Sequence, residues 1–397
     1  MELKYNLSPS AVLATALCAV ILVACSKATE TGPAVPALPE VTPDYRTEMA
    51  PIFQVQQPVA EAPQHDERAQ LGRVLFHDRM LSQNGAVSCS SCHHQSHGFA
   101  EPRALSQGLR EELTDRNASH LANPGAQFAY FWDGRANDLT TQVTMPLENH
   151  VEMGFRSLED LMLRLEQLDY YAPLFEAAFG DPTPSVDRIQ DALSTFLRCL
   201  VSCRSKADDA FVGAMPEVWN PWGVLMGEIE LNGLDDLERR GFELFHGEAQ
   251  CASCHGGPHF NGWGLDFADI GLDADTEGSA STPNDAGGGF FGGWGPTAMK
   301  VPSLRNVALT APYMHDGRFA TLDFRLRDWN SGSIVIGGPD LIEPIIFPGG
   351  GSGDETPPVR LNFTPEERLA LKAFLHSLTD YAFVQDDRFS NPFTTSP

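Results

Sequence analysis

The chain has 397 residues, enough for two domains of ordinary size, and 42% of them are hydrophobic, which indicates a folded protein with a substantial core. Asp and Glu number 53 against 27 Lys and Arg, so the formal net charge is −26. This charge argues against nucleic acid as a partner and against a polybasic membrane contact, because both need a basic surface.

The N-terminus has the pattern of an export signal. An uncharged, mostly apolar run over residues 11–24 is too short to span a bilayer. It leads into Leu-Val-Ala-Cys, which resembles the lipidation motif of bacterial lipoproteins and makes Cys25 the expected lipid anchor; an ordinary signal peptide is the alternative. We expect residues 1–24 to be the signal, and the protein to lie on the periplasmic side of a bacterial membrane, which it contacts only through the lipid. Residues 25–63 are rich in Pro, Ala, Thr and Glu and predict a flexible linker.

Two copies of the pattern C-x-x-C-H follow, one formed by Cys89, Cys92 and His93 and the other by Cys251, Cys254 and His255. This is the attachment pattern of c-type haem, in which the two thiols bond to the haem vinyl groups and the histidine ligates the iron. A redox dithiol needs one copy and no histidine, and a zinc site built from both pairs leaves the two histidines without a role. We therefore predict two covalently bound haem c groups.

Helical periodicity surrounds these motifs at residues 66–76, 157–168, 186–201 and 234–245. A C-terminal helix is expected to begin at Thr364, with a proline next and a capping-box acid after it. Convincing strand pairs are few. The pattern predicts a mainly α fold of two cytochrome c-like haem domains with long loops, a first one over 64–200 and a second one over 201–385.

Two cysteines stand apart from the haem motifs. Cys199 and Cys203 are four residues apart at the end of one predicted helix. An oxidising compartment favours a local disulfide between them, and two buried thiols are the alternative.

Longer motifs flank the two haem patterns in a fixed order: Leu71-Gly-Arg-Val-Leu-Phe76, Phe131-Trp-Asp-Gly-Arg135, Val151-Glu-Met153, and the run Pro302–Gly317. In this order they resemble the bacterial di-haem cytochrome c peroxidases and the related MauG proteins, over about residues 66–380. The resemblance implies an oxidoreductase that acts on hydrogen peroxide. Members of the family are often dimers, so a homodimer is an expectation as well.

The resemblance also implies roles for single residues near the first haem. Glu152 matches the distal acid/base, Gln142 the distal amide and Pro146 a proline that shapes the pocket. Trp132 matches the tryptophan that relays electrons between the haems. Taken without the resemblance, Glu152 is equally well a solvated carboxylate with Glu148 as a competitor, and Trp132 is equally well a core residue.

A calcium ion between the domains is implied in the same way. Asn117 matches its side-chain ligand, and Thr310 and Pro312 match residues that offer backbone carbonyls. A site made only of oxygen atoms suits Ca²⁺.

The first departure from the family concerns the first haem. Many di-haem peroxidases carry a histidine after a Ser-x-Gly stretch, and this histidine blocks the haem until the enzyme is reduced. Here residues 106–108 are Ser-Gln-Gly and the next residue is Leu109, which cannot ligate iron. We therefore expect an open first haem, with His97 and His120 as the alternative ligands.

The second departure concerns the second haem. Relatives carry a methionine or a tyrosine where this chain has Trp329, and an indole has no free lone pair for iron. Met314, His315 and Met299 are the other candidates. A second haem without a methionine ligand is expected to have a lower potential.

Three functions fit these observations. The first is a peroxidase that reduces hydrogen peroxide to water with electrons from a small cytochrome c or a cupredoxin. The second is a MauG-like enzyme that uses peroxide to oxidise residues of a partner protein. The third is a non-enzymatic di-haem electron carrier, which the acid at Glu152 disfavours because a carrier needs no proton shuttle.

Overall fold

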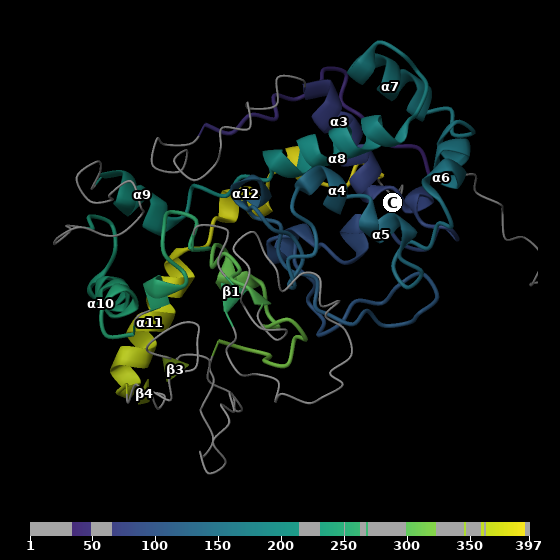
Figure 1. Cartoon of the computed structure of the whole chain (residues 1–397). Helices are drawn as coiled ribbons and strands as arrows, with labels where there is room; N and C mark the ends of the chain where they lie inside the picture. The colour runs from purple at the N-terminus through teal and green to yellow at the C-terminus, as the bar shows by residue number, and fades with distance from the viewer. Residues whose placement is uncertain are drawn as a thin grey trace, which may run out of the picture. The chain divides into compact units, whose positions relative to one another are not determined.

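The computed structural model describes residues 34–48, 66–213, 231–249, 251–262, 267–268, 299–322, 345–346, 359–360 and 363–393 (Figure 1). This part is mainly helical, as expected. Its α-helices are α3 (Asp66–His77), α4 (Leu139–Gln142), α5 (Met145–Glu148), α6 (Leu158–Leu165), α7 (Tyr171–Phe179), α8 (Val186–Cys199), α9 (Lys206–Gly213), α10 (Asp236–His246), α11 (Pro365–Ser377) and α12 (Tyr381–Val384). No described helix is both long and apolar enough to cross a membrane.

Short 3-10 helices and two pairs of very short strands complete the described structure. The 3-10 helices are η1 (Arg79–Leu81), η2 (Cys89–Ser91), η3 (Gln95–His97), η4 (Pro124–Ala126), η5 (Cys251–Ser253), η6 (Val307–Leu309) and η7 (Asp387–Phe389). The antiparallel strand pairs are β1 (Phe267–Ala268) with β2 (Met299–Lys300), and β3 (Ile345–Ile346) with β4 (Val359–Arg360).

Helix α3 lies side by side with α8, and a glycine allows the two backbones to approach closely (Figure 1). A Cβ atom on Gly72 would lie 2.0 Å from the carbonyl oxygen of Ala192 in α8. Any side chain at this position would therefore collide with the neighbouring backbone. Phe76, one turn further along α3, packs its ring 5.4 Å from that of Phe196 in α8.

Helix α10 lies beside α11 in the same way (Figure 1). A Cβ atom on Gly241 would lie 1.9 Å from the carbonyl oxygen of Ala370, and Phe245 packs 5.3 Å from Phe374. Both first helices carry the sequence G-x-x-L-F-H, at residues 72–77 and 241–246. The same helix pair thus occurs twice, once before each haem motif.

The internal repeat continues after the haem motifs. Asn123 and Asn306 have positive φ angles of 54° and 60°, and each begins a 3-10 helix, η4 and η6 respectively. The backbone N–H of Asn123 donates to Leu200 just after α8, and that of Asn306 donates to Leu378 just after α11, at 2.9 and 3.1 Å. The chain therefore makes two copies of one helix–loop–helix arrangement.

The two copies also exchange equivalent hydrogen bonds. Asn117 in the first copy donates its backbone N–H to the carbonyl of His315 in the second, at 2.8 Å. Lys300, which holds the position in the second copy that Asn117 holds in the first, donates to the carbonyl of Trp132 at 2.7 Å. These reciprocal contacts join the copies through loops rather than helices.

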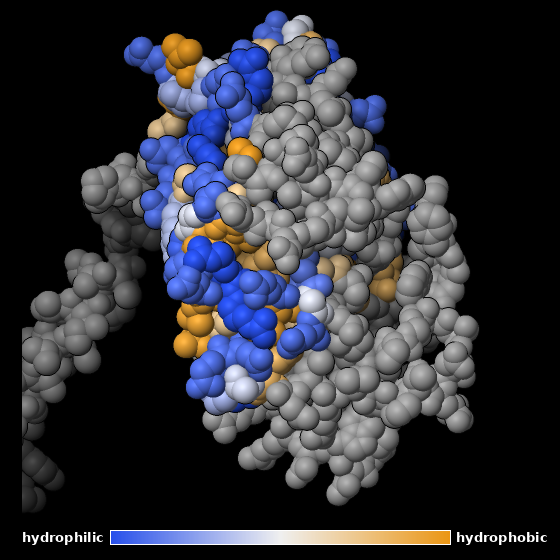
Figure 2. Space-filling model, turned by 90° about the vertical axis from the view of Figure 1, so that its left-hand side faces the viewer, coloured by the Kyte–Doolittle hydropathy of each residue, from blue (hydrophilic) through white to orange (hydrophobic). Residues whose placement is uncertain are grey.

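Each of the two copies has its own hydrophobic core. The first lies among α3, α6, α7 and α8 and receives Phe383 and Phe389 from the end of the chain. The second lies among α9, α10 and α11, with Phe260 from the loop after the second haem motif. On the face seen in Figure 2 polar side chains predominate among the described residues, and apolar ones are exposed between them.

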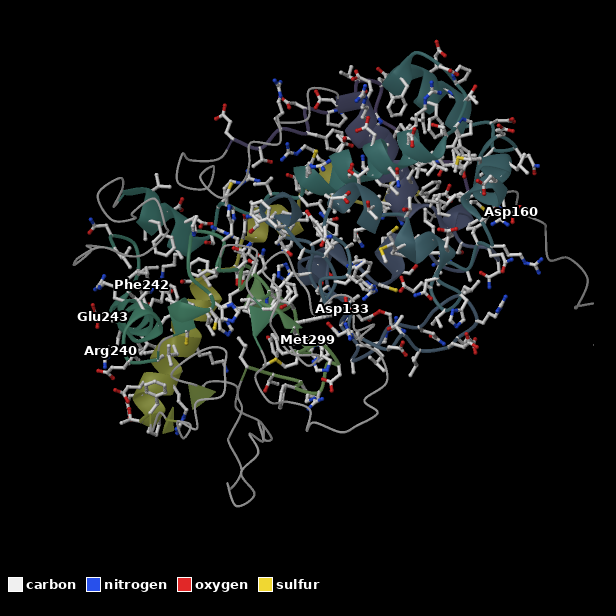
Figure 3. The ribbon with its side chains drawn as sticks, in the orientation of Figure 1. Asp133, Asp160, Arg240, Phe242, Glu243 and Met299 are labelled. Carbon is white, nitrogen blue, oxygen red and sulfur yellow. The ribbon has the colours of Figure 1, made fainter. Side chains whose placement is uncertain are left out.

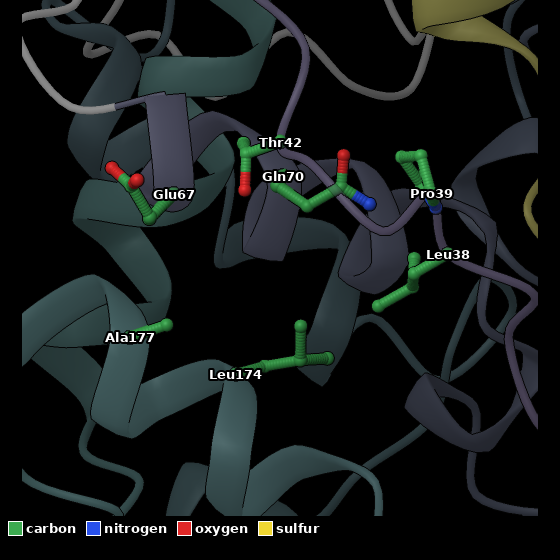
Figure 4. A pocket seen from close by; sticks show the side chains of 7 residues that line it. All are labelled: Leu38, Pro39, Thr42, Glu67, Gln70, Leu174 and Ala177. Carbon is green, nitrogen blue, oxygen red and sulfur yellow. The ribbon is translucent and has the colours of Figure 1, made fainter.

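Part of the segment expected to be a linker packs against the body. Tyr45 is fully buried; its hydroxyl donates to Gln70 of α3, and its backbone N–H donates to Asp66 at 2.9 Å. A cavity of about 80 Å³ separates this segment from α3 and α7 and is lined by Leu38, Pro39, Thr42, Glu67, Gln70, Leu174 and Ala177 (Figure 4). Residues 37–48 thus pack on the body and do not belong to a free linker.

The five helices expected from periodicity are confirmed, as is the capping box between Thr364 and Glu367. Helices α7 and α9 were not expected. The signal segment and Trp329 lie outside the described residues. Cys199 and Cys203 are free thiols that lie near the carbonyls of Thr195 and Glu48, at 3.1 and 3.8 Å, which agrees with the buried-thiol alternative.

Candidate functional site

The first C-x-x-C-H motif forms a tight turn that presents one histidine nitrogen. Cys89 begins η2, and the backbone N–H of His93 donates to the carbonyl of Cys89 at 3.0 Å. The Nδ1 atom of His93 hydrogen-bonds to the carbonyl of Phe99 at 2.8 Å, which leaves Nε2 for an iron. Burial lowers the pKa of His93, so the ring is neutral and its lone pair is available.

The second motif repeats this arrangement. The backbone N–H of His255 donates to Cys251 at 2.8 Å. The Nδ1 atom of His255 has two carbonyl partners, Phe260 at 3.3 Å and Pro302 at 3.1 Å. Burial lowers the pKa of His255 to about 4. In both motifs two thiols that are not in a disulfide, together with the oriented, neutral histidine, fit a c-type haem.

Glu152 lies on a segment that folds back on itself after α5. The N–H of Met153 donates to the carbonyl of Pro146 at 3.3 Å, and that of Gly154 donates to the carbonyl of Asn149 at 2.9 Å. The side-chain oxygen of Asn149 accepts from the N–H groups of Val151 and Glu152, at 2.9 and 3.4 Å. The Nδ2 atom of Asn149 donates to Glu152 Oε1 at 2.9 Å, so one amide holds both the backbone and the carboxyl of Glu152.

The electrostatic surroundings of Glu152 favour its protonated form. Burial raises the pKa of Glu152, and the positive charge of Arg135 partly offsets this effect. Burial also raises the pKa of Cys89 to about 12 and that of Cys92 to about 11, and the charge of Glu152 adds to both shifts. Glu152 is therefore a half-buried carboxyl within electrostatic range of the first haem-attachment thiols.

Arg135 is held in place by its own loop. Its guanidinium carbon lies 3.5 Å from the ring centre of Phe131, and its Nη1 lies 2.9 Å from Asp133. Asp133 also pairs with Arg116 at 2.8 Å. Figure 3 labels Asp133 and Met299. Lys300 follows Met299 in strand β2, and its backbone N–H donates to the carbonyl of Trp132, the residue before Asp133.

Leu109 packs against the segment that carries Glu152. Its N–H donates to the carbonyl of Val151 at 3.0 Å, and its side chain lies so close to Gly154 that a Cβ there would meet it at 2.9 Å. A Cβ on Gly108 would lie 1.8 Å from the Val151 carbonyl oxygen. The position that is a histidine in many relatives thus holds a buried aliphatic side chain beside the candidate acid.

Trp132 lies where the two copies meet. Its indole Nε1 donates to the carbonyl of Asn117 at 2.9 Å, and its ring packs edge to face with His315, with 6.5 Å between the ring centres. Met314, next to His315, has a positive φ of 72°. These contacts give Trp132 a packing role between the two copies, and its role as a relay stays a prediction.

The three candidate calcium ligands come from loops that touch. The backbone N–H of Asn117 donates to the carbonyl of His315. Thr310 lies against Gly98: a Cβ atom placed on Gly98 would lie 3.4 Å from Thr310 Cγ2. Asn117 Nδ2 donates to the carbonyls of Arg103 and Ala104, at 2.9 and 3.2 Å, which turns Oδ1 the other way. Pro312 is on the same loop as Thr310. An amide oxygen and backbone carbonyls are donors that suit Ca²⁺.

The remaining predicted residues are placed as follows. Gln142 is the last residue of α4 and Pro146 lies in the first turn of α5. His97 is next to Ser96, whose hydroxyl lies 3.0 Å from His97 Nδ1. Both ring nitrogens of His120 bond to backbone groups, Nε2 to Ser303 and Nδ1 to Ala122.

The residue that sequence reasoning missed most clearly is Asn149. An asparagine three residues before a carboxylate is a weak signal, because Asx turns are common in loops. Arg135 was quoted only as part of a motif. Its effect on Glu152 depends on how two loops meet, which no local pattern reveals.

The fold and the two haem-attachment motifs define a mainly helical di-haem protein of the c type. A family described as "Di-haem cytochrome c peroxidase" matches residues 66–215. The chain is 36% identical over 271 residues to the "Methylamine utilization protein MauG" of Methylorubrum extorquens, covering 67% of this chain and 69% of that protein. It is 33% identical over 274 residues to the "Cytochrome c551 peroxidase" of Nitrosomonas europaea, covering 67% and 74%.

A solved structure agrees with these relatives. The crystal structure of "a MauG-like protein associated with microbial copper homeostasis" has 31% sequence identity and a TM-score of 0.64, covering 90% of this chain and 99% of that one. The chain therefore belongs to the di-haem cytochrome c peroxidase family, which includes MauG. Membership makes it a peroxidase-type oxidoreductase with two c-type haems.

Proposed function

We propose that this protein reduces hydrogen peroxide to water with electrons from a small redox protein, a cytochrome c or a cupredoxin. The observation that carries the proposal is the half-buried carboxyl of Glu152, held by Asn149 and close to the first haem-attachment thiols. A purely electron-carrying haem protein has no use for such a group. The formal net charge of −26 favours a donor with a basic docking face.

In this proposal each half of the chain is a cytochrome c-like domain with one haem. Cys89 and Cys92 would hold the first haem and His93 would ligate it; Cys251, Cys254 and His255 would do the same for the second. The first haem supplies the iron at which peroxide is reduced. Leu109 supports an open face on that haem at rest, because its side chain offers no ligand atom.

Glu152 moves the proton that the reaction needs. Its carboxylate would accept a proton from hydrogen peroxide and return it to the departing oxygen, which leaves as the first water. Two electrons from the donor protein and two further protons would convert the other oxygen to the second water. Asn149 orients the carboxyl, and Gln142 and Pro146 complete the pocket wall. Trp132 relays electrons from the second haem, and a calcium ion on Asn117, Thr310 and Pro312 would fix the loops that surround it.

The test is steady-state turnover of hydrogen peroxide with reduced cytochrome c, without prior reduction of the enzyme. We expect Glu152→Gln to lower kcat by about 10²–10⁴, and the matched control Glu148→Gln, on an exposed carboxylate of the same segment, to leave it unchanged. A Glu152→Gln enzyme with wild-type turnover would overturn the proposal.

The second candidate is a MauG-like enzyme that oxidises residues of a partner protein. Leu109 at the position of the blocking histidine favours it, as does the resemblance to a MauG-like structure. Negligible turnover, together with a long-lived two-electron-oxidised state after peroxide addition, would select this function. Export and lipid attachment at Cys25, and a homodimer, belong to the same proposal and are tested by mass spectrometry and by light scattering.

A further inference from the structure

The two candidate haem ligands have equivalent backbone hydrogen-bond partners. His93 bonds to Phe99 in the loop of its own motif, at 2.8 Å, and to the backbone of Ser119, the residue before His120. His255 has the equivalent partner, Phe260, but only at 3.3 Å, and a closer one in Pro302 at 3.1 Å. Pro302 belongs to the segment that meets the other copy of the repeat. The ligand of the second haem therefore has an acceptor whose position depends on the contact between the copies.

His120 in the first copy anchors this acceptor. Its Nε2 atom lies 2.9 Å from the carbonyl oxygen of Ser303, the residue after Pro302. Its Nδ1 atom accepts from the N–H of Ala122 at 3.2 Å. Because Nδ1 accepts, Nε2 carries the hydrogen and donates to Ser303. Burial and the nearby charge of Lys300 lower the pKa of His120 to about 4, so this neutral form persists at physiological pH.

Ser303 is also fixed on its other side. Its hydroxyl donates to the carbonyl of His259 at 2.5 Å and accepts from the N–H of Arg305 at 3.1 Å. His120 and Ser303 hold equivalent positions in the two copies, three residues before Asn123 and Asn306. Their hydrogen bond therefore joins equivalent residues of the two copies. The turn that contains each of these residues lies next to one candidate haem-ligating histidine.

We propose that His120 is a positioning residue for the second haem: by holding the Ser303 carbonyl it places the Pro302 carbonyl to accept from His255 Nδ1. This proposal rests on the proposed function, since it takes His255 as the iron ligand. A carbonyl that accepts from the distant nitrogen of a ligating histidine makes the ligand more basic and stabilises the oxidised iron. The first copy thereby lowers the potential of the second haem.

The experiment is a spectroelectrochemical titration of the holoprotein that resolves both haems. His120→Leu removes the donor and is expected to favour reduced second haem about tenfold, a rise of about 59 mV for one electron. His120→Gln keeps an N–H at the same reach and is expected to restore the wild-type value. His77→Leu is the control, because His77 is also buried and also bonds to a carbonyl, that of Phe389 at 3.0 Å.

Each result bears on the proposal. A second-haem potential that is the same in wild type and His120→Leu would overturn it, as would an equal shift in His77→Leu, which would show a general packing effect. Either result leaves wild-type peroxide turnover and the count of two covalent haems intact, so the proposed function would stand. A wild-type protein with one covalent haem would instead remove the basis of both proposals.

Discussion

Asn149→Ala gives a direct test of how the candidate acid is controlled. The substitution removes the 2.9 Å hydrogen bond to Glu152 Oε1. A hydrogen bond to a charged group contributes about 1.5–3 kcal/mol and one to a neutral group about 1 kcal/mol, so the carboxylate form loses about 1 kcal/mol more than the acid form. At about 1.4 kcal/mol per pKa unit, the pKa of Glu152 should rise by nearly one further unit.

The direction of the effect on activity follows from the role of Glu152 as the proton acceptor. Burial already holds the pKa of Glu152 above its ordinary value, so turnover should be lost as the pH falls through that raised pKa. In Asn149→Ala the acid limb of the kcat/KM profile for peroxide should move to higher pH by about one unit. At pH values well above this acid limb, the activity of Asn149→Ala should largely recover.

Two further variants make the result decisive. Asn149→Asp keeps an oxygen for the N–H groups of Val151 and Glu152 but places a second carboxylate beside Glu152, so the limb should move further in the same direction. Glu148→Gln removes an exposed charge and should leave the limb in place. If the acid limb of a correctly folded, haem-loaded Asn149→Ala enzyme stayed at the wild-type pH or moved to lower pH, the reasoning would be refuted.

Three other predictions follow from features described above. Leu109→His should convert the resting first haem to a six-coordinate, low-spin form in the ferric absorption spectrum and make turnover depend on prior reduction; an unchanged spectrum would contradict the placement of Leu109. Gly241→Ala should lower the free energy of unfolding by about 3 kcal/mol in chemical denaturation, because its Cβ would lie 1.9 Å from the Ala370 carbonyl oxygen, and a change below about 0.5 kcal/mol would contradict the close crossing. Chelation of calcium should lower turnover in the wild type, and Asn117→Ala should be impaired already and insensitive to the chelator.

The sequence was informative where a pattern is local. The haem motifs have fixed spacing, and the helices α3, α8, α10 and α11 have apolar residues at helical intervals, so both could be read directly. The role of Gly72 and Gly241 could not be predicted, because a glycine in a sequence does not indicate which backbone packs against it. Tyr45 was missed for a related reason: a single aromatic residue in a Pro-rich segment carries no periodicity that would indicate docking.

The site was predicted to a similar extent. Glu152 and Trp132 were identified through a family motif, whereas the residues that contact them were not. Asn149 holds Glu152 through an Asx turn in the same loop, and Trp132 donates to Asn117 in another loop. His120 bonds to Ser303 in the opposite copy of the repeat. Contacts between distant segments depend on tertiary packing, which a single sequence does not specify.

The reciprocal bonds between the copies, from Asn117 to His315 and from Lys300 to Trp132, have a consequence for electron flow. Any hinge motion that separated the halves would break both bonds together, so these bonds oppose a change in the spacing of the two haem-attachment motifs. Because electron-transfer rates fall steeply with separation, a constant spacing would keep transfer between two bound haems at a constant rate.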